Sequence, residues 1–140
     1  MILVDTNVVS ELMKIAPLAN VVNWLNIQKF SDRYVLTITL GEIVYGLHIL
    51  PDAKRRLQLI ERFERFDALA FAQHVLSYDE AAAHAYGEVM SHRKAVGHPM
   101  SVPDGQIAAI ARSRGFRVAT RNSKDFEDCG IDLIDPYATD

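Results

Sequence analysis

Hydrophobic residues in this chain alternate between short, mostly unbroken runs and longer stretches with helical spacing. The short runs predict strands, because strands buried on both faces are largely apolar; they lie at residues 2–4, 34–38, 74–77, 116–120 and 131–134. Between them, hydrophobic side chains recur every three or four residues, as on amphipathic helices, at residues 8–13, 21–25, 40–47, 51–66, 80–95 and 103–114. Such alternation is typical of a parallel sheet covered on both faces. The pattern therefore predicts an α/β fold, a three-layer α/β/α sandwich with a central parallel sheet of about five strands.

Polar residues that favour helix N-termini mark where some of these helices should begin. Asp5, Thr6 and Asn7 directly follow the first apolar run, so the turn into the first helix is expected there. Thr39 is the expected cap of the helix that follows the second predicted strand. This boundary places Glu42 in the first turn of that helix.

Composition indicates one ordinary domain with a modest negative charge. The 140 residues include 15 Lys and Arg against 18 Asp and Glu, a net charge of −3, and 49% are hydrophobic. We therefore expect a single domain over residues 1–140 that buries a core without metal or disulfide support. Cys129 is the only cysteine, so no intramolecular disulfide can form. With no signal sequence and no bilayer-length apolar run, a cytoplasmic protein without membrane contact is expected.

Four oxygen-bearing side chains are expected at one edge of the sheet. Asp5 follows the first predicted strand, Glu42 the second and Asn122 the fourth, while Asp104 lies at the start of the last predicted helix. The carboxyl ends of parallel strands meet at one edge, where ligands bind. Three carboxylates brought together there repel one another unless a cation lies among them. Because oxygen ligands favour Mg²⁺ or Mn²⁺ over zinc, the sequence predicts such a metal site and a phosphate-bearing substrate.

Each of these acids also has a simpler interpretation. Asp5 and Asp104 suit helix caps, and Glu42 suits the positive end of a helix dipole. Their convergence at strand ends favours the metal site, because independent capping does not require it. Other chemistries lack their motifs, since the histidines show no zinc-ligand spacing and there is no GxxxxGKS/T, GxGxxG or GxSxG sequence. Cys129 lies in an acidic stretch that disfavours a thiolate nucleophile.

Four motifs, in order along the chain, resemble those of the PIN-domain ribonucleases. They read ILVDTNVVS at residues 2–10, TLGEI at 39–43, PDGQIAA at 103–109 and VATRN at 118–122. The likeness runs from residue 1 to about residue 136 and is closest to the toxin branch called VapC, with its FitB-like members. The resemblance implies a PIN-like domain and a metal-dependent RNA endonuclease, toxic to its own bacterium until a co-expressed antitoxin blocks it.

The resemblance also implies which residues bind the metal ion. Asp5, Glu42 and Asp104 would be the metal ligands for Mg²⁺, with Mn²⁺ as the other candidate ion. Asn122 takes a fourth catalytic position, which is Asp in some members and Asn in others. An amide adds an oxygen without a charge, so a second ion is expected to bind less tightly here.

Further residues are expected to orient groups at the site or to bind RNA. Hydrogen bonds that orient waters or carboxylates are expected from four residues, Thr6, Asn7, Ser10 and Thr120. Phosphates of the RNA substrate are expected to contact Arg121 and Lys124 near the site. Arg93 and Lys94 are candidates for contacts farther out.

The implied partners are proteins as well as RNA. The resemblance implies a homodimer in which each protomer accepts the C-terminal segment of an antitoxin, which gives a toxin–antitoxin hetero-oligomer. A basic side chain of the antitoxin often reaches toward the acidic site. A docking groove is expected where apolar side chains gather on two predicted helices: Tyr45, Leu47, Ile49 and Leu50 beside Trp24 and Phe30. The simpler interpretation is that these side chains are ordinary core.

Two other functions stay open at this point. Asn122 and the sequence pI near 5.9 are compatible with a catalytically weak PIN-fold module that binds RNA or regulates. The nuclease and the catalytically weak module differ in the expected effect of Asp5→Asn. This substitution abolishes cleavage by a nuclease and changes little in such a module. An Asp at the end of the first strand also occurs in dehalogenase-like and receiver-like phosphoryl-transfer domains, but this chain lacks the second acid of a DxD motif.

Overall fold

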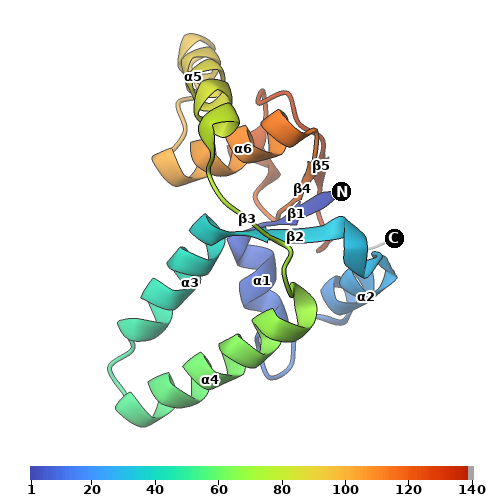
Figure 1. The fold of residues 1–140 in the computed structure, drawn as a ribbon, viewed down its shortest axis with the longest axis vertical. Helices are drawn as coiled ribbons and strands as arrows, with labels where there is room; N and C mark the ends of the chain where they lie inside the picture. Colours follow the sequence, from blue (N-terminus) through green and yellow to red (C-terminus); the bar gives the residue numbers. More distant parts are fainter. Residues whose placement is uncertain (139–140) are drawn as a thin grey trace.

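Five parallel strands form the central sheet of the computed structural model, which describes residues 1–138 (Figure 1). Their order across the sheet is β3-β2-β1-β4-β5, with the bounds β1 (Ile2–Val4), β2 (Arg33–Leu36), β3 (Val75–Leu76), β4 (Arg117–Ala119) and β5 (Leu133–Ile134). All three side chains of β1 are buried, which explains the unbroken apolar run. The predicted α/β fold is confirmed. The last residues of the predicted domain, 139–140, lie outside the described residues.

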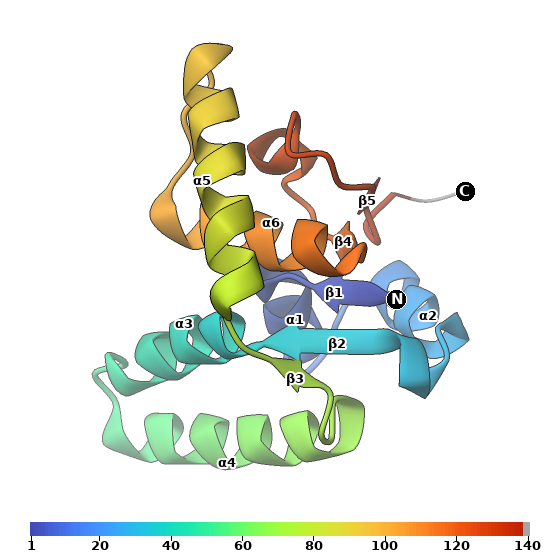
Figure 2. The same cartoon turned by 45° about the horizontal axis from the view of Figure 1, so that its top comes forward.

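Helices cover both faces of the sheet and give the molecule three layers (Figures 1 and 2). One face carries α1 (Thr6–Leu12), α2 (Ala19–Ile27), α3 (Thr37–His48) and α4 (Ala53–Ala70), and the other carries α5 (Glu80–Ala95) and α6 (Val102–Arg114). Leu3 packs with α5 and α6 in one core cluster, whereas Val4 packs with the other four helices in a second. Single 3-10 turns form η1 (Phe30–Asp32) and η2 (Ser123–Phe126). Within residues 1–138, no helix combines the length and apolarity needed to cross a membrane.

The order of the strands reverses at β1, the central strand of the sheet. Such a reversal leaves a crevice outside the carboxyl end of the strand. β2 and β3 lie on one side of β1, and β4 and β5 lie on the other. This reversal of strand order is where open α/β sheets bind ligands. Asp5 lies at this point, and its backbone N–H donates to the carbonyl of Ala119 in β4 at 2.9 Å.

The boundary between β2 and α3 differs from the prediction. β2 ends at Leu36 and α3 begins at Thr37, so the predicted strand over residues 34–38 extends too far and Thr39 is not the cap. Thr39 is fully buried inside the helix instead. Pairing between β2 and β3 ends at Leu36, because β3 has only two residues, which pair with the last two residues of β2. As a result, Glu42 lies in the second turn of α3 rather than in the first.

Helices α3 and α4 extend away from the sheet beside one another, as both views show (Figures 1 and 2). A groove of ≈ 470 Å³ lies between them and α1; Met13, Ile43, Leu47 and Leu59 are among its lining residues. The predicted grouping with Trp24 and Phe30 is wrong, because α2 packs on α1 and Trp24 borders a different pocket. Tyr45 is 66% exposed and does not line the groove.

The helix pair of α5 and α6 is packed closely where α6 begins. Gly105 lies in the first turn of α6, and a Cβ at this position would overlap Sδ of Met90 and lie 3.1 Å from Cε2 of Tyr86, both in α5. This approach of backbone to side chains fixes the start of the helix that carries Asp104. A larger residue at position 105 would require the Met90 side chain to shift.

We expect Gly105→Val to lower the free energy of unfolding by about 1–3 kcal/mol, the cost of overpacking a close contact. Gly87→Val is the matched control, because Gly87 is an exposed residue of α5 with nothing within 4 Å of its Cβ position. The control should unfold as the wild type does or slightly later. Urea denaturation followed by circular dichroism measures both, and equal midpoints for the two variants would contradict the packing argument.

Candidate functional site

Asp5 is the residue on which the other site residues converge. It caps α1, where its Oδ1 accepts a hydrogen bond from the backbone N–H of Thr6 at 2.8 Å. Its Oδ2 accepts from the hydroxyl of Thr120 at 2.8 Å and from Nδ2 of Asn7 at 3.3 Å. The residue is only 7% exposed. Asp5 is therefore a helix cap, as the simpler interpretation held, and also a buried acid at the crevice.

The partners of the Asp5 carboxylate are neutral. Burial raises its pKa above the ordinary value, whereas the hydrogen bonds from Thr120 and Thr6 act in the opposite direction. The negative charges of Asp104 and Glu42 raise the pKa further. Among residues 1–138, no lysine, arginine or histidine forms an ion pair with Asp5. The acid is thus left with like charges nearby and no cation to offset them.

Glu42 and Asp104 reach this region from the two opposite helical layers. Glu42 is exposed on α3, and its Oε1 accepts a hydrogen bond from the hydroxyl of Thr6 at 3.0 Å. Asp104 is half-buried in the first turn of α6, where its backbone N–H donates to Oγ of Ser101 at 3.3 Å. The two acids thus approach Asp5 from opposite layers, close enough for their charges to raise its pKa, without forming a group of three metal ligands within residues 1–138.

Thr120 and Asn7 tie the ends of β1 and β4 together. The fully buried Thr120 hydroxyl donates to Asp5 and accepts from Nδ2 of Asn7 at 3.3 Å and from the backbone N–H of Asn122 at 3.1 Å. Oδ1 of Asn7 accepts from the backbone N–H of Arg121 at 3.2 Å. The hydroxyl and the amide thus fix the orientation of the Asp5 carboxylate.

The other predicted residues lie at the edges of this network. Asn122 is exposed at the start of η2 and makes no side-chain capping bond there. Ser10 has no side-chain hydrogen bond within residues 1–138 and lines the groove beside α3. Arg121 and Lys124 are exposed and border a pocket of ≈ 410 Å³ next to Asn122. Their functional roles stay predictions.

A buried arginine lies near Asp104, where the sequence analysis did not expect one. Arg93 is only 6% exposed, and its Nη1 donates to the carbonyl of Glu127 at 2.6 Å. The expectation that it contacts RNA on an outer surface is therefore wrong. Burial raises the pKa of Asp104 and the Arg93 charge opposes this effect. The sequence does indicate that Arg93 is buried, because it continues the helical spacing of the other buried residues of α5: Ala82, Ala85 and Val89.

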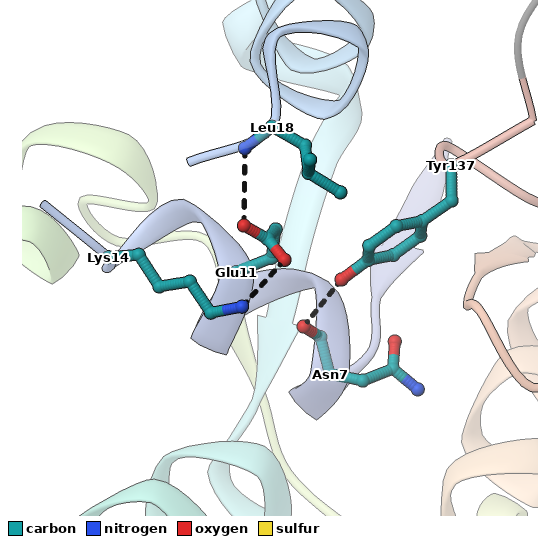
Figure 3. A network of polar contacts seen from close by, with 5 residues as sticks. All are labelled: Asn7, Glu11, Lys14, Leu18 and Tyr137. Atoms are coloured by element: carbon teal, nitrogen blue, oxygen red, sulfur yellow. Dashed lines mark hydrogen bonds and ion pairs between the residues drawn. The ribbon is translucent and has the colours of Figure 1, made fainter. Parts of the chain in front are cut away.

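Tyr137 joins the site from the C-terminal segment, and no motif marked it. Its hydroxyl donates to the backbone carbonyl of Asn7 at 3.1 Å (Figure 3). One turn along α1, Glu11 is 4% exposed and accepts from Nζ of Lys14 at 3.0 Å and from the backbone N–H of Leu18 at 3.2 Å (Figure 3). The Lys14 hydrogen bond holds the pKa of Glu11 below its usual value. Both contacts fix α1, which begins at the site.

The donors at the site are oxygens, which suit a hard divalent cation. A buried carboxylate between two like charges is a group that such a cation stabilises. Within residues 1–138, no three His, Cys, Asp or Glu side chains lie close enough together to hold an ion as they stand. The oxygen donors are of the kind that Mg²⁺ or Mn²⁺ takes, and an ion held by all three acids would need Asp104 and the exposed Glu42 side chain to come closer to Asp5.

The chain is similar to known proteins along nearly its whole length. Residues 2–131 match the PIN domain family. VapC ribonuclease Y4jK of Sinorhizobium fredii is 39% identical over 137 residues, which cover 98% of this chain and 98% of that protein. Toxin FitB of Neisseria gonorrhoeae is 35% identical over 137 residues, 98% of this chain and 99% of that protein. The crystal structure of FitAcB from Neisseria gonorrhoeae superposes with a TM-score of 0.92 at 34% identity, covering 99% of this chain and 100% of that one.

We expect Thr120→Val to lower the free energy of unfolding by about 1.5–3 kcal/mol, because the buried carboxylate of Asp5 loses a hydrogen bond. The loss should be smaller in mildly acidic solution than at neutral pH, because the hydroxyl donates to the ionised carboxylate. Thr120→Ser is the control, since it keeps the hydroxyl and loses one methyl group, at about 1 kcal/mol. Thermal unfolding at several pH values measures the difference. Equal losses in the two variants would contradict the role of the hydroxyl.

Proposed function

The chain belongs to the PIN-domain family, and from this premise we propose that it is an endoribonuclease that acts as the toxin of a toxin–antitoxin pair. The names of its relatives support this proposal, since one is a VapC ribonuclease and another a toxin. In the proposed reaction, water hydrolyses RNA phosphodiester bonds with the help of Mg²⁺ or Mn²⁺. The products are a 5′-phosphate and a 3′-hydroxyl.

The buried carboxylate of Asp5 is the observation that carries the proposal. Burying a charged group without a cation opposes folding, and such groups cluster at functional sites. A helix cap alone needs neither burial nor further acids, yet Asp104 and Glu42 lie close enough to raise the pKa of Asp5. Asp5 lies where the strand order reverses, which is where α/β folds bind substrates.

Asp5, Glu42 and Asp104 are the residues that would hold the ion. A divalent ion bound there supplies a water of lowered pKa and offsets charge on the phosphate. Thr120 donates to Oδ2 of Asp5, so the orientation of this carboxylate is set before any ion binds. The half-buried Asp104 is held by the start of α6, and Glu42 is the acid with the greatest freedom to move.

The second candidate function is a catalytically weak module that keeps the fold and binds RNA or regulates. Asn122 favours it, because an amide stands where an acid would add a charge to the site. The absence of a preformed group of three metal ligands within residues 1–138 points the same way. The two functions differ in whether the protein cleaves RNA.

Cleavage of a total small-RNA pool by the purified protein tests the proposal. The wild type should yield discrete products with Mg²⁺ or Mn²⁺ and none with EDTA. Asp5→Asn should lose cleavage by at least about 100-fold, because it removes the charge of a metal ligand. Gel electrophoresis or sequencing of the cleaved ends measures the products and identifies the RNA.

Asp132→Asn is the matched control, an exposed acid placed before β5 at the other end of the sheet. It should cleave as the wild type does. Equal products from wild type and Asp5→Asn would identify a contaminating nuclease and count against the proposal. Folded wild type without any cleavage would favour the regulatory module.

We also propose that the groove between α1, α3 and α4 accepts the C-terminal segment of the antitoxin. Its lining combines apolar side chains with the cations Lys14, Arg55 and Arg62, and includes Thr6 and Glu42 of the acidic site. A segment that fills the groove therefore contacts the site directly. We further propose a homodimer and a toxin–antitoxin hetero-oligomer, for which exposed apolar residues of α3, such as Tyr45, offer surface.

Gly46→Phe should block this complex by filling the groove. Gly46 lies one turn after Glu42 and lines the groove, and nothing lies within 4 Å of its Cβ position, so a side chain added here begins in open space beside the groove. Co-purification with a co-expressed cognate antitoxin should fall at least about tenfold, which corresponds to roughly 1.4 kcal/mol. Gly87→Phe, in the exposed part of α5, is the control. Unchanged co-purification of Gly46→Phe would place the antitoxin elsewhere.

A further inference from the structure

Arg121 lies on the aromatic ring of Tyr137, at the mouth of the crevice. Its Cζ is 4.7 Å from the ring centroid, within the range of a cation–π contact. Tyr137 is itself held in place, because its backbone N–H donates to Oδ1 of Asp135 at 2.9 Å and its hydroxyl donates to the carbonyl of Asn7 at 3.1 Å. The ring therefore offers a fixed surface for a guanidinium group.

The same hydrogen-bond network connects this pair to the acidic site. Asn7 accepts from the backbone N–H of Arg121 through Oδ1, accepts from Tyr137 through its carbonyl, and donates to Asp5 through Nδ2. One residue thus positions the buried carboxylate and both members of the stacked pair. A ligand held by Arg121 is for this reason kept at a set place relative to Asp5.

The guanidinium of Arg121 is left with donors to spare. It makes no ion pair and no side-chain hydrogen bond within residues 1–138, although arginine has five N–H donors. Arg121 and Lys124 border the pocket of ≈ 410 Å³, whose lining also includes Asn122, Ser123, Asp125 and Asp135. The two cations balance the two lining carboxylates, and Asp135 already accepts the backbone N–H of Tyr137, so the N–H donors of the Arg121 guanidinium stay free for a phosphodiester.

We propose that Tyr137 is a positioning residue that stacks on Arg121 and fixes it as a ligand for the phosphate of an RNA nucleotide beside the cleaved bond. This inference rests on the proposed function for its substrate class. The planar guanidinium donates to phosphate oxygens with two N–H groups at once, and the ring of Tyr137 restricts its orientation. Lys124 adds a second, less directional charge at the same pocket.

Binding of a fluorescein-labelled twelve-nucleotide oligouridylate, measured by fluorescence anisotropy with EDTA present, tests the site without cleavage. Arg121→Gln should weaken binding about tenfold and make the slope of log K against log salt shallower by about 0.7, the value for one phosphate on a single strand. Tyr137→Leu should weaken binding about two- to fivefold, the scale of an exposed cation–π contact. Tyr137→Phe keeps the ring and should bind within about twofold of the wild type.

Arg117→Gln is the matched control for charge, because Arg117 is an exposed arginine at the opposite end of β4. Circular dichroism shows whether each variant is folded. An Arg121→Gln loss no greater than that of Arg117→Gln, or a wild type that does not bind the probe, overturns the phosphate site. Equal losses in Tyr137→Phe and Tyr137→Leu overturn the role of the ring.

Cleavage separates this inference from the proposed function. In the metal-dependent assay, Arg121→Gln should raise KM while kcat changes less than threefold, whereas Asp5→Asn abolishes kcat. Binding that depends on Arg121 without any cleavage by the wild type would count against the nuclease and in favour of the site. A fall in kcat alone, with KM unchanged, would overturn the assignment of Arg121 to substrate binding.

Discussion

The hydrogen bond from Thr120 to Asp5 joins the ends of the two central strands through a carboxylate that is 7% exposed. Because β1 and β4 are neighbours in the sheet, the residues that follow them must share one small space. The chain fills that space with an acid and neutral donors rather than with an ion pair. The arrangement is destabilising for an ionised acid, and everything else at the site is placed around it.

Asn7 extends this constraint beyond the carboxylate. Its side chain contacts Asp5, Thr120 and the backbone of Arg121, and its carbonyl accepts from Tyr137. A residue with separate donors and acceptors can satisfy all four partners, which a carboxylate or an aliphatic side chain cannot. The acid and the cation of the site are therefore positioned by the same turn at the start of α1.

The sequence predicted the sheet and the position of Asp5 after its first strand, because both follow from local patterns. An apolar run ending in Asp5 is a buried strand followed by a cap, whatever the rest of the chain does. The end of β2 could not be predicted, since it depends on the short length of its neighbour β3. Arg93 was expected on an outer surface because it is charged, although its spacing indicated burial. Tyr137 was not predicted at all, because its partner Asn7 lies far away in the sequence.

The shared residues of the groove and the acidic site have a consequence for the proposed inhibition. Thr6 lines the groove, and its hydroxyl donates a hydrogen bond to Glu42. The backbone N–H of Thr6 donates to the side chain of Asp5, which caps α1. A peptide in the groove would therefore contact Glu42, one of the acids proposed to hold the ion. Arg121 and Lys124 border a separate pocket, so the proposed phosphate contact lies outside the groove. In the proposed mode of inhibition, an occupant of the groove would thus act on ion binding rather than on the contact with RNA.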